Sequence, residues 1–188
     1  MIDRLFTEAR THSQFAPIPV PDALLQRIYD LASLGPTSMN CQPARFVFVT
    51  SSAGRERLLP HVFVGNQAKV NSAPVTVIVA RDTRFYEWMP KNWHVPDALE
   101  NFERKPELAR ETAVRNGTLT GAYFLMAARA QGLTCGPMSG FDAHGLNSSF
   151  FNDGRWEADF LINLGYPAGP ASRPRGHRLG FADACRIA

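Results

Sequence analysis

Three short segments place hydroxyl, amide and glycine residues where a hydrophobic core would not need them. Residues 35–43 read Gly-Pro-Thr-Ser-Met-Asn-Cys-Gln-Pro, residues 66–69 read Asn-Gln-Ala-Lys, and residues 136–142 read Gly-Pro-Met-Ser-Gly-Phe-Asp. Side-chain amides both donate and accept hydrogen bonds. Glycine lets the backbone approach a flat ligand closely and leaves its amide donors exposed. The three segments therefore have the chemistry to hold a planar, polar-edged molecule.

Each segment also has an ordinary structural explanation. Hydroxyls and amides in a turn such as residues 35–43 usually satisfy nearby backbone groups. Residues 136–142 are equally well a strand-to-helix turn in which Asp142 is the N-cap. A fourth segment, Arg10-Thr11-His12-Ser13, is weak alone, because Arg10 can simply complement the C-terminus of a helix.

Length and composition bound the class of protein. The chain has 188 residues, of which 45% are hydrophobic and 20% charged, as is usual for a soluble globular protein. It shows neither a 20-residue apolar stretch nor an N-terminal apolar signal, so we expect a single cytoplasmic domain, residues 1–188, with no membrane contact. The odd number of cysteines (Cys41, Cys135, Cys185) indicates free thiols, and the scattered histidines argue against a metal site.

Hydrophobic periodicity and helix signals predict a mixture of helices and strands, which fits an α+β fold. We expect helices over residues 2–11, from 21–22 to 35, from 51–52 to 59, over 106–131, and briefly after 142. We expect strands over residues 46–49, 75–79, 133–134 and 160–164, with an irregular region over 81–104.

The second half of the long predicted helix, residues 117–131, is apolar or small on nearly every face. Thr118, Thr120, Arg129 and Gln131 are its polar residues. A helix that is apolar all round is buried on all sides. In a chain of this length, a second subunit is expected to cover part of it.

Taken in chain order, the four segments resemble the nitroreductase-like flavoproteins. Residues 36–43 are similar to that family's Pro-Ser-x-x-Asn-x-Gln-Pro signature, residues 66–69 to its Asn-x-x-Lys element, and residues 137–141 to its Pro-x-x-Gly-Phe turn. The resemblance covers nearly the whole chain. Residues 82–87, 111–116, 136–142 and 183–185 look closest to the malonic-semialdehyde-reductase-like branch, whose members are described as NADH dehydrogenases or NAD(P)H nitroreductases.

The resemblance implies a homodimer with a central mixed or antiparallel sheet, flanking helices and a long central helix at the interface. It implies one FMN per active site, reduced by NADH or NADPH, and a second substrate that is a small aldehyde such as malonic semialdehyde, a quinone or a nitro compound. Hydride passes through flavin N5, so no acid–base residue is obligatory.

The resemblance also assigns residues to each part of FMN. It assigns the phosphate to Arg10, His12, Arg175 and Arg178, with Arg173 as the alternative to the last two. The competing explanation for the C-terminal arginines is a solvated basic tail. By the same resemblance, Asn66 binds the pyrimidine edge of the ring. The ring or ribityl side is lined by Pro36, Thr37, Ser38 and Asn40. The N5 and O4 atoms are contacted by Met138, Ser139 and Gly140.

Three positions depart from the family pattern. Gln14 stands where many members have a second cation near the flavin, and we expect Lys69 to stabilise the reduced ring instead. Ala44 stands where many have tryptophan, which would widen the pocket. Ser139 replaces an acidic residue, and the lower negative charge would suit an anionic substrate.

Substrate contacts and rival functions stay open at this point. Phe85, Tyr86 and Trp88 are either a lid over a planar ligand or core anchors, and Arg84, Arg104 and Arg115 are unassigned. One rival function is a dehalogenase or flavin-cleaving enzyme of the same fold. The other is a basic nucleic-acid-binding module, which a net charge of only +3 supports poorly, so we expect no nucleic-acid partner.

Overall fold

The structure is a computed structural model that describes residues 2–171 and 173–188. In these residues a four-stranded sheet consists of β1 (Ala44–Val49), β2 (Val75–Asp82), β3 (Thr134–Met138) and β4 (Trp156–Gly165). The strand order is β1-β2-β4-β3 and each neighbouring pair is antiparallel. This confirms the predicted α+β class, and it makes β1 and β3 the edge strands.

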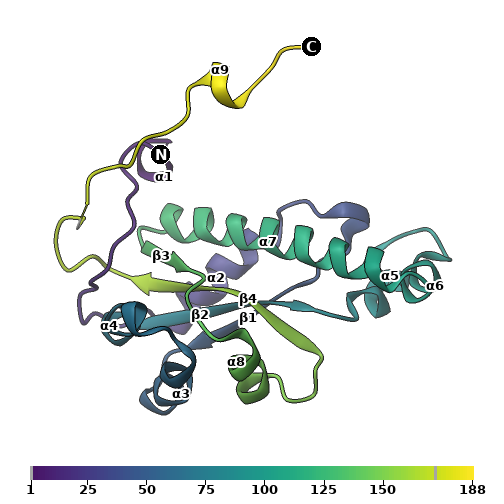
Figure 1. Cartoon of the computed structure of the whole chain (residues 1–188), viewed down its shortest axis with the longest axis horizontal. Helices are drawn as coiled ribbons and strands as arrows, with labels where there is room; N and C mark the ends of the chain where they lie inside the picture. The colour runs from purple at the N-terminus through teal and green to yellow at the C-terminus, as the bar shows by residue number, and fades with distance from the viewer. Residues whose placement is uncertain (1, 172) are drawn as a thin grey trace.

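Helices cover both faces of the sheet (Figure 1). On one face lie α2 (Asp22–Ala32) and α7 (Pro106–Ala130); on the other lie α3 (Ser52–Leu58), α4 (Val64–Ser72) and α8 (Ala143–Phe150). Successive strand residues point to opposite faces. Thus Val77 and Val79 pack in the core beneath α2 and α7, whereas Ile78 and Ala80 belong to the opposite core.

The region between β2 and α7 is more ordered than the sequence predicts. It contains η3 (Phe85–Trp88), α5 (Met89–Asn92) and α6 (Ala98–Glu103), which pack on a core cluster of their own. Phe85 is fully buried and is therefore a core anchor, while Trp88 is 48% exposed. The other short elements are α1 (Ile2–Leu5), η1 (Ser38–Asn40), η2 (Leu59–His61) and α9 (Phe181–Ala184).

The helix predicted over residues 2–11 is wrong beyond Leu5. The carbonyl groups of Phe6, Thr7 and Ala9 accept hydrogen bonds from the Arg175 guanidinium. Further along, Thr11 forms a parallel bridge with Cys135 in β3. Side-chain and strand partners thus replace the helical hydrogen bonds that periodicity predicts.

Two further predictions need correction. Residues 136–138, expected in a turn, are the end of β3, and the bend begins at Ser139. Helix α4 was not predicted, and it carries the segment 66–69. Other boundaries are confirmed: the Ser51 hydroxyl caps α3 by accepting from the Gly54 amide, and Gly132, with φ of 88°, follows the end of α7.

A buried charge cluster fastens one end of the sheet. Asp82, 1% exposed, ends β2 and forms ion pairs of 2.6 Å with both Arg45 in β1 and Arg155 just before β4. Arg155 also pairs with Glu87 at 2.6 Å. Across residues 2–171 and 173–188, no helix has the length and apolarity to cross a membrane.

Candidate functional site

The bend after β3 is held against the start of α4. The Phe63 amide donates to the Gly140 carbonyl oxygen at 3.0 Å, and the Asp142 amide donates to the His61 carbonyl oxygen at 2.7 Å. Between them, Val62 and Phe141 form an antiparallel bridge. This two-stranded contact fixes the bend beside the first turn of α4.

That contact brings three of the predicted site residues together. Asn66 Nδ2 donates to the Gly140 carbonyl oxygen at 3.2 Å, and Lys69 Nζ donates to Asn66 Oδ1 at 2.8 Å. A Cβ at Gly140 would collide with Asn66 Nδ2, so the Asn66 side chain can take this position only because residue 140 is glycine. The Asn66 amide retains one N–H and one lone pair, which suits an imide-like ring edge.

A strongly cationic cavity of about 490 Å³ lies between the N-terminal segment, α4 and the C-terminal segment. Its basic lining residues are Arg10, Lys69, Arg129, Arg173, Arg175 and Arg178. In the part of the chain that the structure describes, none of these six cations forms an ion pair with an acidic residue. Arg175 instead donates to the backbone carbonyls of residues 6, 7 and 9.

This donor set fits a phosphate group. Guanidinium groups without carboxylate partners keep their charge available for an anion, and arginine matches phosphate geometry. The structure thus brings the predicted Arg10, Arg175 and Arg178 to one cavity, together with the alternative Arg173. Lys69 lines the same cavity and is hydrogen-bonded to Asn66, so the cationic cavity and the Asn66–Gly140 contact adjoin.

Arg129 is a residue that the sequence analysis did not assign to the site. It stands in the last turn of α7, and its Nη1 donates to the Leu5 carbonyl oxygen at 3.1 Å. The signal was present, because Arg129 is one of few polar residues in an otherwise apolar stretch.

His12 lines an adjoining cavity of about 160 Å³ that shares Arg10 and Arg129 with the larger one. Burial lowers the pKa of His12 below its usual 6.5. The imidazole is therefore largely neutral at pH 7 before an anion binds.

The loop of residues 35–43 lies elsewhere. The Ser38 amide donates to Asn116 Oδ1 on α7 at 2.8 Å, and Asn40 Nδ2 donates to the Asn92 carbonyl oxygen in α5 at 3.1 Å. The loop leads into β1, whereas Gly140 follows β3 at the opposite edge, three strand spacings or about 14 Å away. Within one chain, the predicted Pro36, Thr37, Ser38 and Asn40 are thus separated from Asn66 and Gly140.

The conformation of that loop is unusual. Met39, Asn40 and Gln42 have φ of 52°, 50° and 43°, in the left-handed region that favours glycine. The Thr37 hydroxyl holds the loop by accepting from the Gln42 amide at 3.2 Å. Backbone strain of this kind concentrates at functional sites.

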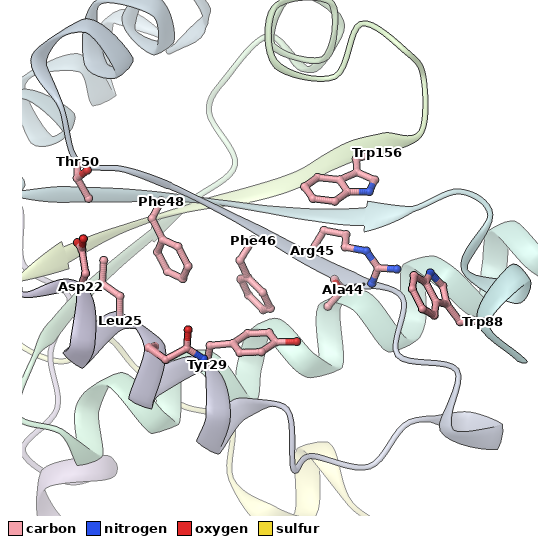
Figure 2. A pocket seen from close by; sticks show the side chains of 11 residues that line it. Asp22, Leu25, Tyr29, Ala44, Arg45, Phe46, Phe48, Thr50, Trp88 and Trp156 are labelled. Atoms are coloured by element: carbon pink, nitrogen blue, oxygen red, sulfur yellow. Dashed lines mark hydrogen bonds between the residues drawn. The ribbon is translucent and has the colours of Figure 1, made fainter. Parts of the chain in front are cut away.

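A larger cavity of about 670 Å³ runs along the free edge of β1 (Figure 2). Five of its eleven lining residues are aromatic (Tyr29, Phe46, Phe48, Trp88 and Trp156), and we call it the aromatic cavity. None of the predicted cofactor-binding residues lines it.

Comparison with known proteins identifies the family. The sequence profile of the nitroreductase family matches residues 7–166. The chain belongs to the nitroreductase family. A protein of Ralstonia nicotianae, named as an NADH dehydrogenase/NAD(P)H nitroreductase, is 48% identical over 187 residues, which are 100% of this chain and 96% of that protein.

Solved structures of nitroreductases share the fold. A crystal structure named as a nitroreductase from Bacillus subtilis has a TM-score of 0.88 and 25% identity, covering 100% of this chain and 98% of that one. Another, from Exiguobacterium sibiricum and described as a complex with FMN, has a TM-score of 0.87 and 18% identity, covering 98% and 96%.

The positions that depart from the nitroreductase pattern have defined places in the structure. Gln14 lies beside residue 168, whose amide donates to its carbonyl oxygen at 3.4 Å. Ala44 begins β1 and lines the aromatic cavity. Ser139 forms the bend itself, where its carbonyl accepts from the Phe141 amide at 3.1 Å. Of the unassigned arginines, Arg84 pairs with Glu87 at 3.6 Å.

Proposed function

We propose that this nitroreductase-family chain is an FMN-dependent NAD(P)H oxidoreductase. The observation that carries the proposal is the position of Lys69, which is bonded to Asn66 beside the Gly140 bend and also lines the cationic cavity. A ring-edge site at Asn66 and a phosphate site in the cavity would therefore adjoin, as the binding of one molecule with both groups requires. The name of the Ralstonia relative and the FMN in the Exiguobacterium structure support the same cofactor and reductant.

The residues present divide the binding of FMN between them. Arg10, Arg129, Arg175 and Arg178 would hold the phosphate, and Asn66 would pair with the pyrimidine edge. Bound FMN supplies a carrier that takes up hydride from NAD(P)H and releases it to a second substrate.

Lys69 and the bend after β3 would tune that carrier. The Lys69 ammonium adds positive charge beside Asn66, which favours the electron-rich reduced form of a bound flavin. The backbone amides of Ser139 and Gly140 and the residue before them, Met138, are the expected partners of N5 and O4. Residue 139 is serine, so the first residue of this bend adds no negative charge beside the expected position of N5.

A homodimer would complete the site. The strained loop of residues 35–43 lies on α7, where a Cβ at Gly35 would stand 2.7 Å from the Tyr123 ring. On the same helix Leu119 and Tyr123 are 41% and 40% exposed, which is unusual for large apolar side chains on a central helix. Packing two copies along α7 would bury these residues and carry the loop of one copy towards the other's Asn66.

The second substrate is proposed as a small aldehyde such as malonic semialdehyde, or a quinone or nitro compound. The uncharged Ser139 supports an anionic aldehyde, and the names of the relatives support nitro compounds. Anaerobic titration of the FMN-loaded protein with NADH and NADPH tests the proposal. Loss of the flavin's visible absorption is expected, followed by its return when an aldehyde, quinone or nitroaromatic is added; an unchanged spectrum with both nicotinamides would refute it.

A further inference from the structure

One buried amide has a donor that the fold leaves unused. Asn163 in β4 is 1% exposed, and its Oδ1 accepts from the Thr76 hydroxyl at 2.8 Å. Among the residues that the structure describes, its Nδ2 is the buried side-chain nitrogen or oxygen without a hydrogen-bond partner. An unmade hydrogen bond in the interior costs stability that an apolar side chain would not lose. A hydrogen-bond acceptor that approaches when a ligand binds would satisfy this donor.

The surroundings of Asn163 point to that partner. Asn163 is paired across the sheet with Gly136 in β3. A Cβ on Gly136 would stand 3.0 Å from the His12 carbonyl oxygen and 3.6 Å from Asn163 Cβ. The His12 carbonyl oxygen and the Asn163 side chain thus lie on either side of the position that a Cβ of residue 136 would occupy. The absence of a side chain at residue 136 lets the segment around His12 approach β3.

The segment that carries this carbonyl is the one that holds the anion site. Thr11 is bridged to Cys135 at the β3 edge, and Arg10 and His12 line the two cationic cavities. The Ser72 hydroxyl, at the end of α4, donates to the Ser13 carbonyl oxygen at 3.4 Å, a long hydrogen bond. Residues 10–13 therefore lie between the cationic cavities and the buried side chain of Asn163.

We propose that Asn163 is a positioning residue for the phosphate-binding segment. When residues 10–13 close on the phosphate, Asn163 Nδ2 donates to the His12 carbonyl oxygen, directly or through one water molecule. This hydrogen bond would fix the backbone between Arg10 and Ser13 in the bound geometry, and Thr76 would hold the amide in the orientation that presents its N–H groups. The proposal rests on the proposed function, because the ligand that closes the segment is the phosphate of FMN.

The test compares FMN affinity with the folding of the apo-protein. In the double variant Thr76→Val/Asn163→Leu the polar pair becomes an apolar pair, so neither member is left unpaired. Flavin-free protein of this variant should unfold at the same temperature as wild type or higher, while its Kd for FMN rises about tenfold, the effect of one lost hydrogen bond. Thr112→Val, which alters another buried threonine, is the control and should leave the Kd unchanged.

A second measurement keeps the proposal testable if the double variant does not fold. In wild-type protein, the Asn163 side-chain NH₂ resonances should shift and gain protection from solvent exchange when FMN saturates the site. A Kd within twofold of wild type in a folded double variant, or Asn163 resonances that FMN leaves unchanged, would overturn the proposal. Failure of wild-type protein to bind FMN would instead refute the proposed function.

Discussion

Asn66 and Gly140, 74 residues apart in sequence, are joined by a hydrogen bond of 3.2 Å between the Asn66 amide nitrogen and the Gly140 carbonyl oxygen. The bond ties α4 to the bend after β3. It uses one N–H of the Asn66 amide, and Lys69 donates to the amide oxygen, so one N–H and one lone pair of Asn66 remain available. The geometry of the proposed ring-edge site therefore depends on the lack of a side chain at residue 140.

Gly140→Ala should displace Asn66, because the added methyl group would occupy the position of Asn66 Nδ2. We expect the Kd for FMN to rise about tenfold, as for one lost hydrogen bond. Fluorescence titration of flavin-free protein measures it. Gly65→Ala on the same helix is the control, because nothing lies within 4 Å of the added carbon; equal affinities in the two variants would contradict the assigned role of Asn66.

Lys69→Ala should slow the reduction of bound flavin by NADH about tenfold or more, because the reduced ring would lose a stabilising positive charge. Stopped-flow absorbance under anaerobic conditions measures the rate. Lys91→Ala, at a lysine beside Trp88 and away from the cationic cavity, should leave the rate unaltered. A Lys69→Ala protein that keeps both its flavin and its reduction rate would refute the role.

Arg10→Ala and Arg129→Ala should each weaken FMN binding about tenfold or more, because each removes a charged donor from the phosphate site. Riboflavin has no phosphate, so its affinity should stay the same in both variants. Increasing salt should weaken FMN binding more than riboflavin binding. Equal losses for the two flavins would mean that these arginines support the fold rather than the phosphate.

Asp82→Asn should reduce the free energy of unfolding by about 3 kcal/mol, because the half-buried Arg45 and Arg155 would lose the buried carboxylate that pairs with both. Urea denaturation of the flavin-free protein measures the change. Asp159→Asn, at a carboxylate that accepts from an exposed threonine hydroxyl, serves as the comparison and should cost far less. A loss below 1 kcal/mol at Asp82 would show that the charge cluster is not what fastens this end of the sheet.

Local sequence patterns predicted the main helices and strands because the signals for these elements lie within or next to their own residues. The β-branched run that becomes β2, the Ser51 cap and the Gly132 terminus each carry their own signal. The helix prediction for residues 2–11 was wrong because Arg175, which donates to their carbonyl groups, lies more than 160 residues away in sequence. Helix α4 lacked a clear apolar period, and its place is fixed by pairing of residues 61–63 with the 139–142 bend.

The resemblance to the family located most of the proposed site, but not its geometry. Asn66, Lys69, Gly140, Arg10, Arg175 and Arg178 do adjoin, whereas residues 36–40 lie at the opposite edge of the sheet. The place of residues 36–40 in the site stays a prediction, because it needs a second copy of the chain. The assignment of residues 1–188 to a single domain is also still a prediction. Arg129 stands out in the sequence only as a polar residue in an apolar stretch, because its place in the cavity depends on the contact between the end of α7 and residues 5–10.

The central claim is that one flavin mononucleotide binds to each chain at the Asn66–Gly140 contact and the cationic cavity. Titration of flavin-free protein with FMN, followed by visible absorbance and by the mass of the complex in solution, tests it most directly. We predict saturation at one FMN per chain in a particle of two chains. A protein that stays colourless and takes up no FMN at any concentration tried would contradict the account.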